Sequence, residues 1–320
     1  MSEQRLNSCR PGTDPLMAFS NILFVPLKMR GNPAAIRKIS AAVERNRAEL
    51  TVMGVVEEQS RFHRLLERAP LDSSIRDAEQ RDLVERLGSY CEALGLEDAH
   101  QLLRSGIPPL TIIEQAIAGR HDLVVVTTDD DRHDHATIKR LLRKCPCPVW
   151  VIRPTRAKVQ RILAAVNPSP AERGLNREIL GSALAMHDLF GGELHVVHTW
   201  KLQGESTLRN SAFLHTPPDE VDRLVDEEHE FHSRAFDELL EDDGGEAPWQ
   251  PHLIEGSPAE AIPDLMKRKR INLLVMGTVA RTGIAGLLVG NTAEQLIDDV
   301  RCSVIAVKPP GFVSPVASSS

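Results

Sequence analysis

The chain contains eight short runs of apolar residues that are nearly uninterrupted and rich in β-branched side chains. Such runs are typical of strands that are covered on both faces, as in a parallel sheet. They lie at residues 21–27, 49–56, 121–128 and 147–152 in the first half, and at 161–167, 193–200, 271–278 and 302–309 in the second. The pattern predicts two sheets of similar construction, one in each half of the chain.

Helical patterns separate these runs. Residues 33–46 place Ile36, Ile39 and Val43 at spacings of three and four, and residues 175–190 show the same spacing, so both segments are expected to be amphipathic helices. An alternation of strands and helices implies right-handed crossovers. We therefore expect an α/β protein with two tandem, doubly wound, mostly parallel five-stranded sheets and flanking helices.

A further helix is predicted over residues 219–243, and one side of it is strongly acidic. That side is either a solvated surface or a contact for a partner. The buried face is expected to consist of Leu224, Val225, Phe231, Phe236, Leu239 and Leu240.

The two halves also match each other in sequence. Residues 105–128 align without a gap to residues 255–278, which places Gly106 on Gly256 and Asp122 on Asn272. This match indicates an internal duplication. The expected organisation is a first domain at 19–153, a linker at 154–160 and a second domain at 161–310, with disordered tails at 1–18 and 311–320.

Composition narrows the class of protein. Of the 320 residues, 42% are hydrophobic and 26% charged, as in a globular protein, and a net charge of −7 favours neither nucleic acid nor an anionic membrane as a partner. No apolar stretch has the length of a membrane span, and the first residues do not resemble a secretory signal. Five scattered cysteines suit a reducing compartment, so a cytoplasmic location is expected.

The segment after residue 276 carries the clearest chemistry. Gly277 ends a predicted strand, and Gly290, Asn291 and Thr292 open a predicted helix. Open α/β sheets bind ligands at the carboxyl ends of their strands, and the amino end of a helix attracts phosphate. Asn291 or Thr292 could instead simply cap the helix.

This segment resembles the C-terminal signature of the universal stress protein family, Gly-x2-Gly-x9-Gly-Ser/Thr, whose loop wraps the phosphates of ATP in nucleotide-binding members. The chain as a whole is similar to the tandem-domain E-type proteins of that family. Two motif positions differ here, because Ala280 replaces the second glycine and Asn291 the Ser/Thr. The family's adenosine-contacting Asp corresponds to Asn167 in the second domain and Leu27 in the first. The resemblance implies a nucleotide site formed by Asn167, Gly277, Thr278, Ala280, Gly290, Asn291 and Thr292.

The equivalent loop of the first half has no glycine and is acidic, so it is not expected to bind phosphate. Its Asp129, Asp131, His133 and His135 are either divalent metal ligands or part of a solvated loop, and the solvated loop is preferred. Cys145 and Cys147 suggest redox chemistry or zinc, but no second cysteine pair exists to complete a zinc site. Because Cys147 aligns with Cys302 at the entry to the last strand of each half, buried structural thiols are preferred. His195 and His198 are expected on opposite faces of one strand.

We therefore expect a stress-response protein with a regulatory or protective role that binds ATP or AMP, with Mg²⁺, in its second domain only. No catalytic residue, metal site or essential cofactor is expected. The alternatives are a module that binds another ligand or a protein, and a weak ATP-hydrolysing enzyme. The resemblance implies that the two halves pack as an internal pseudo-dimer with residues 147–152 and 302–308 near the interface, and a homodimer of the whole chain stays open.

Overall fold

The computed structural model describes residues 19–29, 33–57, 72–128, 132–154, 159–211, 213–278, 296 and 300–316. The first half consists of β1 (Asn21–Pro26), α1 (Pro33–Asn46), β2 (Glu49–Glu57), α3 (Asp72–Glu92), β3 (His100–Gly106), α4 (Pro108–Ala118), β4 (Leu123–Thr127), α5 (Arg132–Lys144) and β5 (Val149–Ile152). The second half consists of β6 (Arg161–Ala165), a short 3₁₀ turn (Pro170–Glu172), α6 (Arg173–Phe190), β7 (Glu193–Trp200), α7 (Glu205–Asn210), α8 (Pro218–Asp243), β8 (Trp249–Glu255), α9 (Pro258–Lys269), β9 (Leu273–Gly277) and β10 (Ser303–Val307).

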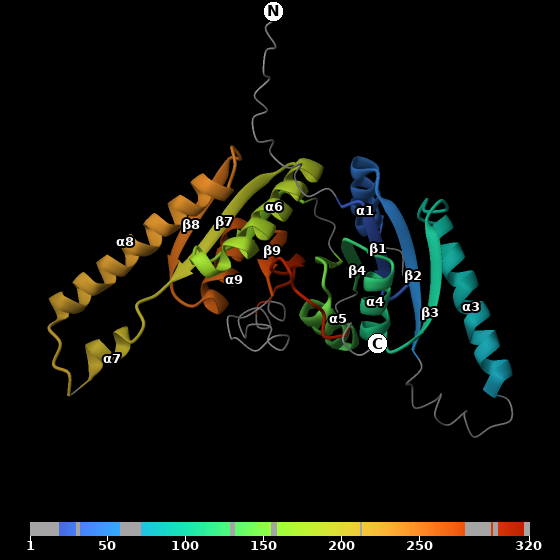
Figure 1. The fold of residues 1–320 in the computed structure, drawn as a ribbon, viewed down its shortest axis with the longest axis horizontal. Coiled ribbons are helices and arrows are strands. Elements are labelled where there is room, and N and C mark those ends of the chain that lie inside the picture. The colour runs from blue at the N-terminus through green and yellow to red at the C-terminus, as the bar shows by residue number, and fades with distance from the viewer. Residues whose placement is uncertain are drawn as a thin grey trace, which may run out of the picture.

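The strands form one sheet in the order β3-β2-β1-β4-β5-β10-β9-β6-β7-β8. Neighbours within each half are parallel, and β5 and β10 pair antiparallel, with Trp150 opposite Ile305. The predicted five strands per half are confirmed, and so is the position of the last strands at the interface. The two expected sheets are, however, joined edge to edge into a single ten-stranded sheet, with α3 and α8 at its opposite ends (Figure 1).

Strands β3 and β8 were not among the eight apolar runs. They are the two edges of the sheet, and most of their residues are exposed or only partly buried. Their sequences, HQLLRSG and WQPHLIE, therefore carry polar residues at positions that are apolar in the inner strands. An edge strand with solvent beside it does not need a continuous hydrophobic run.

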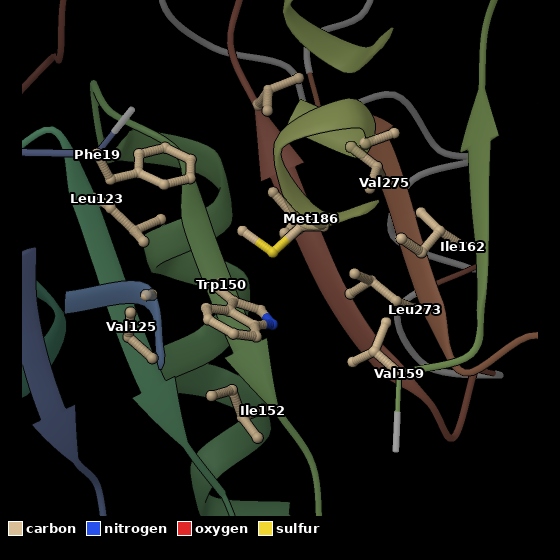
Figure 2. Packing of buried hydrophobic residues seen from close by; sticks show 14 of the residues in the cluster. Phe19, Leu123, Val125, Trp150, Ile152, Val159, Ile162, Met186, Leu273 and Val275 are labelled. Carbon is tan, nitrogen blue, oxygen red and sulfur yellow. The ribbon is translucent and has the colours of Figure 1, made fainter. Parts of the chain in front are cut away.

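Alternating side chains of the strands supply two apolar layers. In β1, Ile22 and Phe24 join a cluster that spans both halves and is covered by α1, α3, α6 and α8, whereas Leu23 and Val25 face α4 and α5. A third cluster packs α9 against the second half. Figure 2 shows Trp150 of β5 in the spanning cluster, with Met186 of α6 pointing toward it from the other half.

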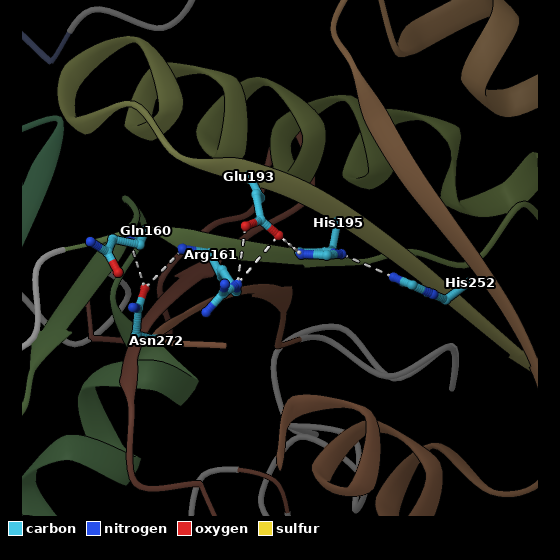
Figure 3. Close-up of polar contacts among 6 residues, drawn as sticks. All are labelled: Gln160, Arg161, Glu193, His195, His252 and Asn272. Carbon is cyan, nitrogen blue, oxygen red and sulfur yellow. Dashed lines mark hydrogen bonds and ion pairs between the residues drawn. The ribbon is translucent and has the colours of Figure 1, made fainter. Parts of the chain in front are cut away.

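The duplication is repeated in the polar contacts. Asp122 accepts hydrogen bonds from the backbone N–H groups of Ser20 (2.7 Å) and Asn21 (3.0 Å), at the start of β1. Its counterpart Asn272 accepts from the N–H groups of Gln160 (3.1 Å) and Arg161 (3.2 Å), at the start of β6 (Figure 3). Asp and Asn both offer an acceptor oxygen, so the exchange preserves this link between neighbouring strands.

Two expectations about the second half are wrong. Phe231 is 63% exposed and does not belong to the buried face of α8, where the predicted Phe236 and Leu239 are joined by Val221. The predicted tail from residue 311 is packed as far as residue 316, since Val316 is buried in an apolar cluster with residues of α4 and α5. Residues 1–18 and 317–320 lie outside the described residues.

Candidate functional site

A cavity of about 560 Å³ opens at the carboxyl ends of β6, β7 and β9. Strands β6 and β9 are neighbours, and α6 after β6 packs on one face of the sheet while Leu296, after β9, packs on the other, so the cavity lies at the switch point of the second half. Its apolar lining includes Ile179, Val197 and Met276, and polar groups stand around them. Small-molecule sites have this size and this combination of surfaces.

Asn167 lines the cavity two residues after the end of β6. Its backbone is held by the side chain of Asn176 in the first turns of α6, which accepts from the Asn167 N–H (3.1 Å) and donates to its carbonyl (2.7 Å). Asn176 is buried and also lines the cavity. The Asn167 side chain is thus presented by a backbone that is fixed on both sides.

Replacing Asn176 with alanine is expected to lower the free energy of unfolding by about 1–3 kcal/mol, because the partly buried Asn167 N–H loses its partner and the Asn167 carbonyl keeps only the Ser169 N–H (2.7 Å). Urea denaturation measures the loss. Asn210→Ala, at an exposed position of α7, is the matched control and should keep the wild-type stability. Equal stability of wild type and Asn176→Ala would contradict this role.

Gly277 also lines the cavity, but the structure gives a different reason for a glycine there. A Cβ atom at residue 277 would lie 2.6 Å from Cδ2 of Leu175 and 3.1 Å from its Cγ. Strand β9 therefore ends without a side chain because α6 packs against it. The expectation that this glycine serves close approach of an anion is not needed to explain it.

Thr278 lines the cavity as well, yet both of its donors are directed elsewhere. Its N–H (3.2 Å) and its hydroxyl (3.5 Å) both donate to the Val307 carbonyl, and the hydroxyl oxygen also accepts from the ammonium group of Lys308. In the first half, the Thr128 N–H makes the equivalent bond to the Ile152 carbonyl (3.3 Å). The N–H contact thus belongs to the repeated fold, and a ligand would meet Thr278 chiefly through its remaining backbone atoms.

Helix α8 supplies a wall of the cavity that the sequence did not predict. Nε2 of His198 on β7 lies 2.8 Å from Nδ1 of His232, and Nε2 of His232 lies 3.3 Å from Oε1 of Glu228. All three residues line the cavity. His195 faces the other side of the sheet, where its Nδ1 lies 3.0 Å from Nε2 of His252, so the prediction that His195 and His198 point to opposite faces is confirmed.

Lys201 is a second lining residue that was missed, and it is exposed. It follows directly after β7, at the same edge of the sheet as Asn167. Its place immediately after a predicted strand was a usable signal. For Glu228 and His232 the sequence offered none, because their position depends on how α8 packs on β7.

The first half arranges the corresponding place differently. The hydroxyl of Thr128, after β4, donates to the carboxylate of Asp134 (2.8 Å) in the first turn of α5, and both residues are buried. A fixed carboxylate at the amino end of a helix occupies the position that favours an anion. Asp129, Asp130 and Asp131 lie outside the described residues, as does the His133 side chain, so the metal alternative stays open.

Four predicted site residues, Ala280, Gly290, Asn291 and Thr292, also lie outside the described residues. Leu296, which follows them, is buried and lines the cavity. The structure thus brings Asn167, Gly277 and Thr278 together, with Leu296 beside them.

A universal stress protein family model matches residues 21–153 and again residues 158–308. The chain belongs to the universal stress protein family. Universal stress protein E of Escherichia coli K12 is 30% identical over 241 residues, which cover 69% of this chain and 74% of that protein. Universal stress protein E of Photorhabdus laumondii is 24% identical, over 94% of this chain and 98% of that protein.

Solved structures of low sequence identity share the fold of this family member. A protein of unknown function from Pseudomonas aeruginosa PAO1 has a TM-score of 0.63 at 22% identity, covering 94% of this chain and 95% of that one. A universal stress protein from Archaeoglobus fulgidus has a TM-score of 0.59 at 16% identity, covering 90% and 98%. Among the helices in the described ranges, none combines the length and apolar character needed to cross a membrane.

Proposed function

We propose that this protein acts in the stress response by binding ATP or a related adenine nucleotide in its second half, and that it acts through binding without turnover. The observation that carries the proposal is the cavity of about 560 Å³ at the switch point of the second half, which contains Asn167, Gly277 and Thr278. The size suits a nucleotide, since small-molecule sites span roughly 300–1,000 Å³.

The lining residues suggest which part of the cavity would hold the base, the ribose and the phosphates of the nucleotide. The apolar part around Ile179, Val197 and Met276 suits a base, and Asn167 beside it offers hydrogen bonds to a ribose or base edge. Lys201 at the rim is a cation for phosphate oxygens. In the first half, Asp134 stands where phosphate would approach, so we assign binding to the second half alone.

Lys201→Glu tests the assignment. Reversing this charge is expected to weaken ATP binding about tenfold or more, which corresponds to about 1.4 kcal/mol, and to leave adenosine binding unchanged. Isothermal titration calorimetry with Mg²⁺ measures both ligands. Lys267→Glu, the same change on the exposed side of α9, is the matched control and should bind ATP like the wild type.

Thermal or urea denaturation with added ligand gives an independent measurement, since ATP at a hundred times its Kd should stabilise the fold by about 2.7 kcal/mol. No stabilisation by ATP, AMP or adenosine at millimolar concentration would overturn the proposal. Equal loss of ATP binding in both lysine variants would show that the site lies elsewhere. Phosphate release from ATP, lowered by Lys201→Glu, would identify turnover at the same site.

A ligand without phosphate is the second candidate, and the α8 wall is the observation that favours it. Glu228 brings a carboxylate to the cavity, and the His198–His232 pair offers hydrogen bonds to a neutral group. A carboxylate repels a triphosphate at short range. Adenosine binding that exceeds ATP binding, together with a gain in ATP affinity in Glu228→Gln, would favour this candidate.

A further inference from the structure

Two cysteines lie side by side where the first half meets the second. Cys145 follows α5 and Cys147 precedes β5, with Pro146 between them. Their sulfur atoms are 3.6 Å apart, within hydrogen-bonding distance for sulfur. Cys145 is fully buried, whereas Cys147 is partly exposed. The two thiols are thus already neighbours, and only one of them faces outward.

A buried cation from the other half stands next to this pair. Lys308 follows β10, and its ammonium group donates to the Leu142 carbonyl of α5 and to the Thr278 hydroxyl. Burial lowers the pKa of Lys308 to about 8, and the Cys145 sulfur acts in the opposite direction. The link to Thr278 connects the cysteine pair with the cavity of the second half.

The surroundings shift the pKa values of the two thiols in opposite directions. The hydrogen bond from Cys147 and the charge of Lys308 lower the pKa of the Cys145 thiol against the effect of burial, and the same hydrogen bond raises the pKa of Cys147 well above its usual range. Thiolate character at one sulfur is what makes a cysteine pair reactive.

A small molecule can reach the pair from one side. A surface cavity of about 400 Å³ is lined by Cys147 and Pro146 together with Arg120, His121 and Phe312. Cys145 is not among its lining residues. An oxidant entering this cavity would therefore meet the sulfur of Cys147 first.

The duplicated half shows what the same position looks like without a pair. Cys302 corresponds to Cys147, and Val300 stands where the first half has Cys145. The Cys302 thiol donates to the Ser303 carbonyl (3.2 Å), and burial raises its pKa to about 12. Cys302 is therefore an internal reference for an unreactive thiol at the same place in the fold.

We propose that Cys145 and Cys147 are a redox pair that hydrogen peroxide oxidises to a reversible intramolecular disulfide. The Cys145 thiolate takes the proton of Cys147, and the Cys147 thiolate formed in this way attacks the peroxide, so that an S–O bond forms, the O–O bond breaks and the released hydroxide takes a proton from solvent to leave as water. The Cys145 sulfur then attacks the sulfenic sulfur of Cys147. The S–S bond forms, the S–O bond breaks, and the Cys145 proton leaves with the hydroxide as a second water.

Peptide mass spectrometry of the full-length protein tests the proposal. Trypsin releases both cysteines in one peptide, residues 145–156, and Cys302 in another. After peroxide and alkylation under denaturing conditions, the 145–156 peptide should be unalkylated and lighter by the mass of two hydrogen atoms, while the Cys302 peptide is alkylated. Dithiothreitol should restore alkylation. Full alkylation of both sulfurs at a peroxide dose that oxidises free glutathione would overturn the proposal.

Variants test the order of the steps and the role of the lysine. Cys145→Ser should form no disulfide, and dimedone should trap a sulfenic acid at Cys147 that forms more slowly than the wild-type disulfide, because both the resolving sulfur and the acceptor of the Cys147 proton are missing. Lys308→Met should slow disulfide formation by about threefold or more, since the neighbouring cation is gone. Lys38→Met, which removes another buried lysine, controls for loosened packing and should oxidise like the wild type. Equal rates in all three proteins would contradict the role of Lys308. None of these readouts requires a nucleotide to bind.

Discussion

Replacing Trp150 with alanine is expected to lower the free energy of unfolding by about 3–5 kcal/mol, the range for deleting a large aromatic side chain from a core. Trp150 is fully buried in the middle of β5 and belongs to the apolar cluster that spans both halves. Its ring centroid lies 6.0 Å from that of Phe190 on α6. The substitution would leave a cavity at the joint of the ten-stranded sheet.

Urea denaturation followed by far-ultraviolet circular dichroism measures this loss without depending on tryptophan fluorescence. Trp150→Phe is the matched control. The Trp150 indole N–H has no hydrogen-bond partner among the described residues, so phenylalanine gives up volume but no hydrogen bond, and its loss should be clearly smaller. If Trp150→Ala unfolds within about 1 kcal/mol of the wild type, the two halves do not depend on this contact.

Acidification is expected to destabilise the second half through the His195–His252 pair. Nδ1 of His195 lies 3.0 Å from Nε2 of His252. On the other side of the His195 ring, Nε2 lies 3.4 Å from the Glu193 carboxylate, which Arg161 also contacts (Figure 3). Burial, the neighbouring His195 and the charges of Lys269 and Arg268 lower the pKa of His252 from 6.5 to about 4. Burial likewise lowers the pKa of His195.

The direction of this pH dependence follows from the protonation of His252 in the unfolded and the folded protein. Below pH 6.5 the unfolded chain takes up a proton at residue 252, while the folded protein keeps this histidine neutral until about pH 4. The contribution of neutral His252 to the free energy of unfolding is therefore fully present above pH 6.5, and it declines as the pH falls from 6.5 to 4. Because His252 is partly exposed, we discount the full linkage value and expect a loss of about 1–3 kcal/mol.

His252→Gln isolates this contribution from that of the carboxylates. Urea midpoints measured between pH 7.5 and pH 4.5 should fall less steeply in His252→Gln than in the wild type. His100→Gln, on the exposed edge strand of the first half, is the matched control and should keep the wild-type slope. Identical slopes for wild type and His252→Gln would show that this pair does not govern the acid response.

For two residues of the site, the structure gives a physical cause that differs from the reason for which the sequence singled them out. Asn167 was chosen as the counterpart of a ligand-contacting Asp, and it does line the cavity, but its placement depends on Asn176. Gly277 was chosen for close approach of an anion, whereas its missing side chain makes room for Leu175. In both cases the local sequence marked the position, and a neighbour on α6 supplied the physical cause.

The sequence by itself determined the inner strands, their alternation with helices and the duplication, because burial on both faces requires continuous apolar runs and the two halves repeat them in register. Only the tertiary structure decided the edge strands β3 and β8, whose exposed sides remove the hydrophobic signal. It also decided the joining of β5 to β10, the α8 wall of the cavity and the meeting of Cys145 with Lys308. These contacts form between elements that are often far apart in the sequence, and they depend on how the surfaces of those elements pack. A local hydrophobic pattern therefore does not predict them.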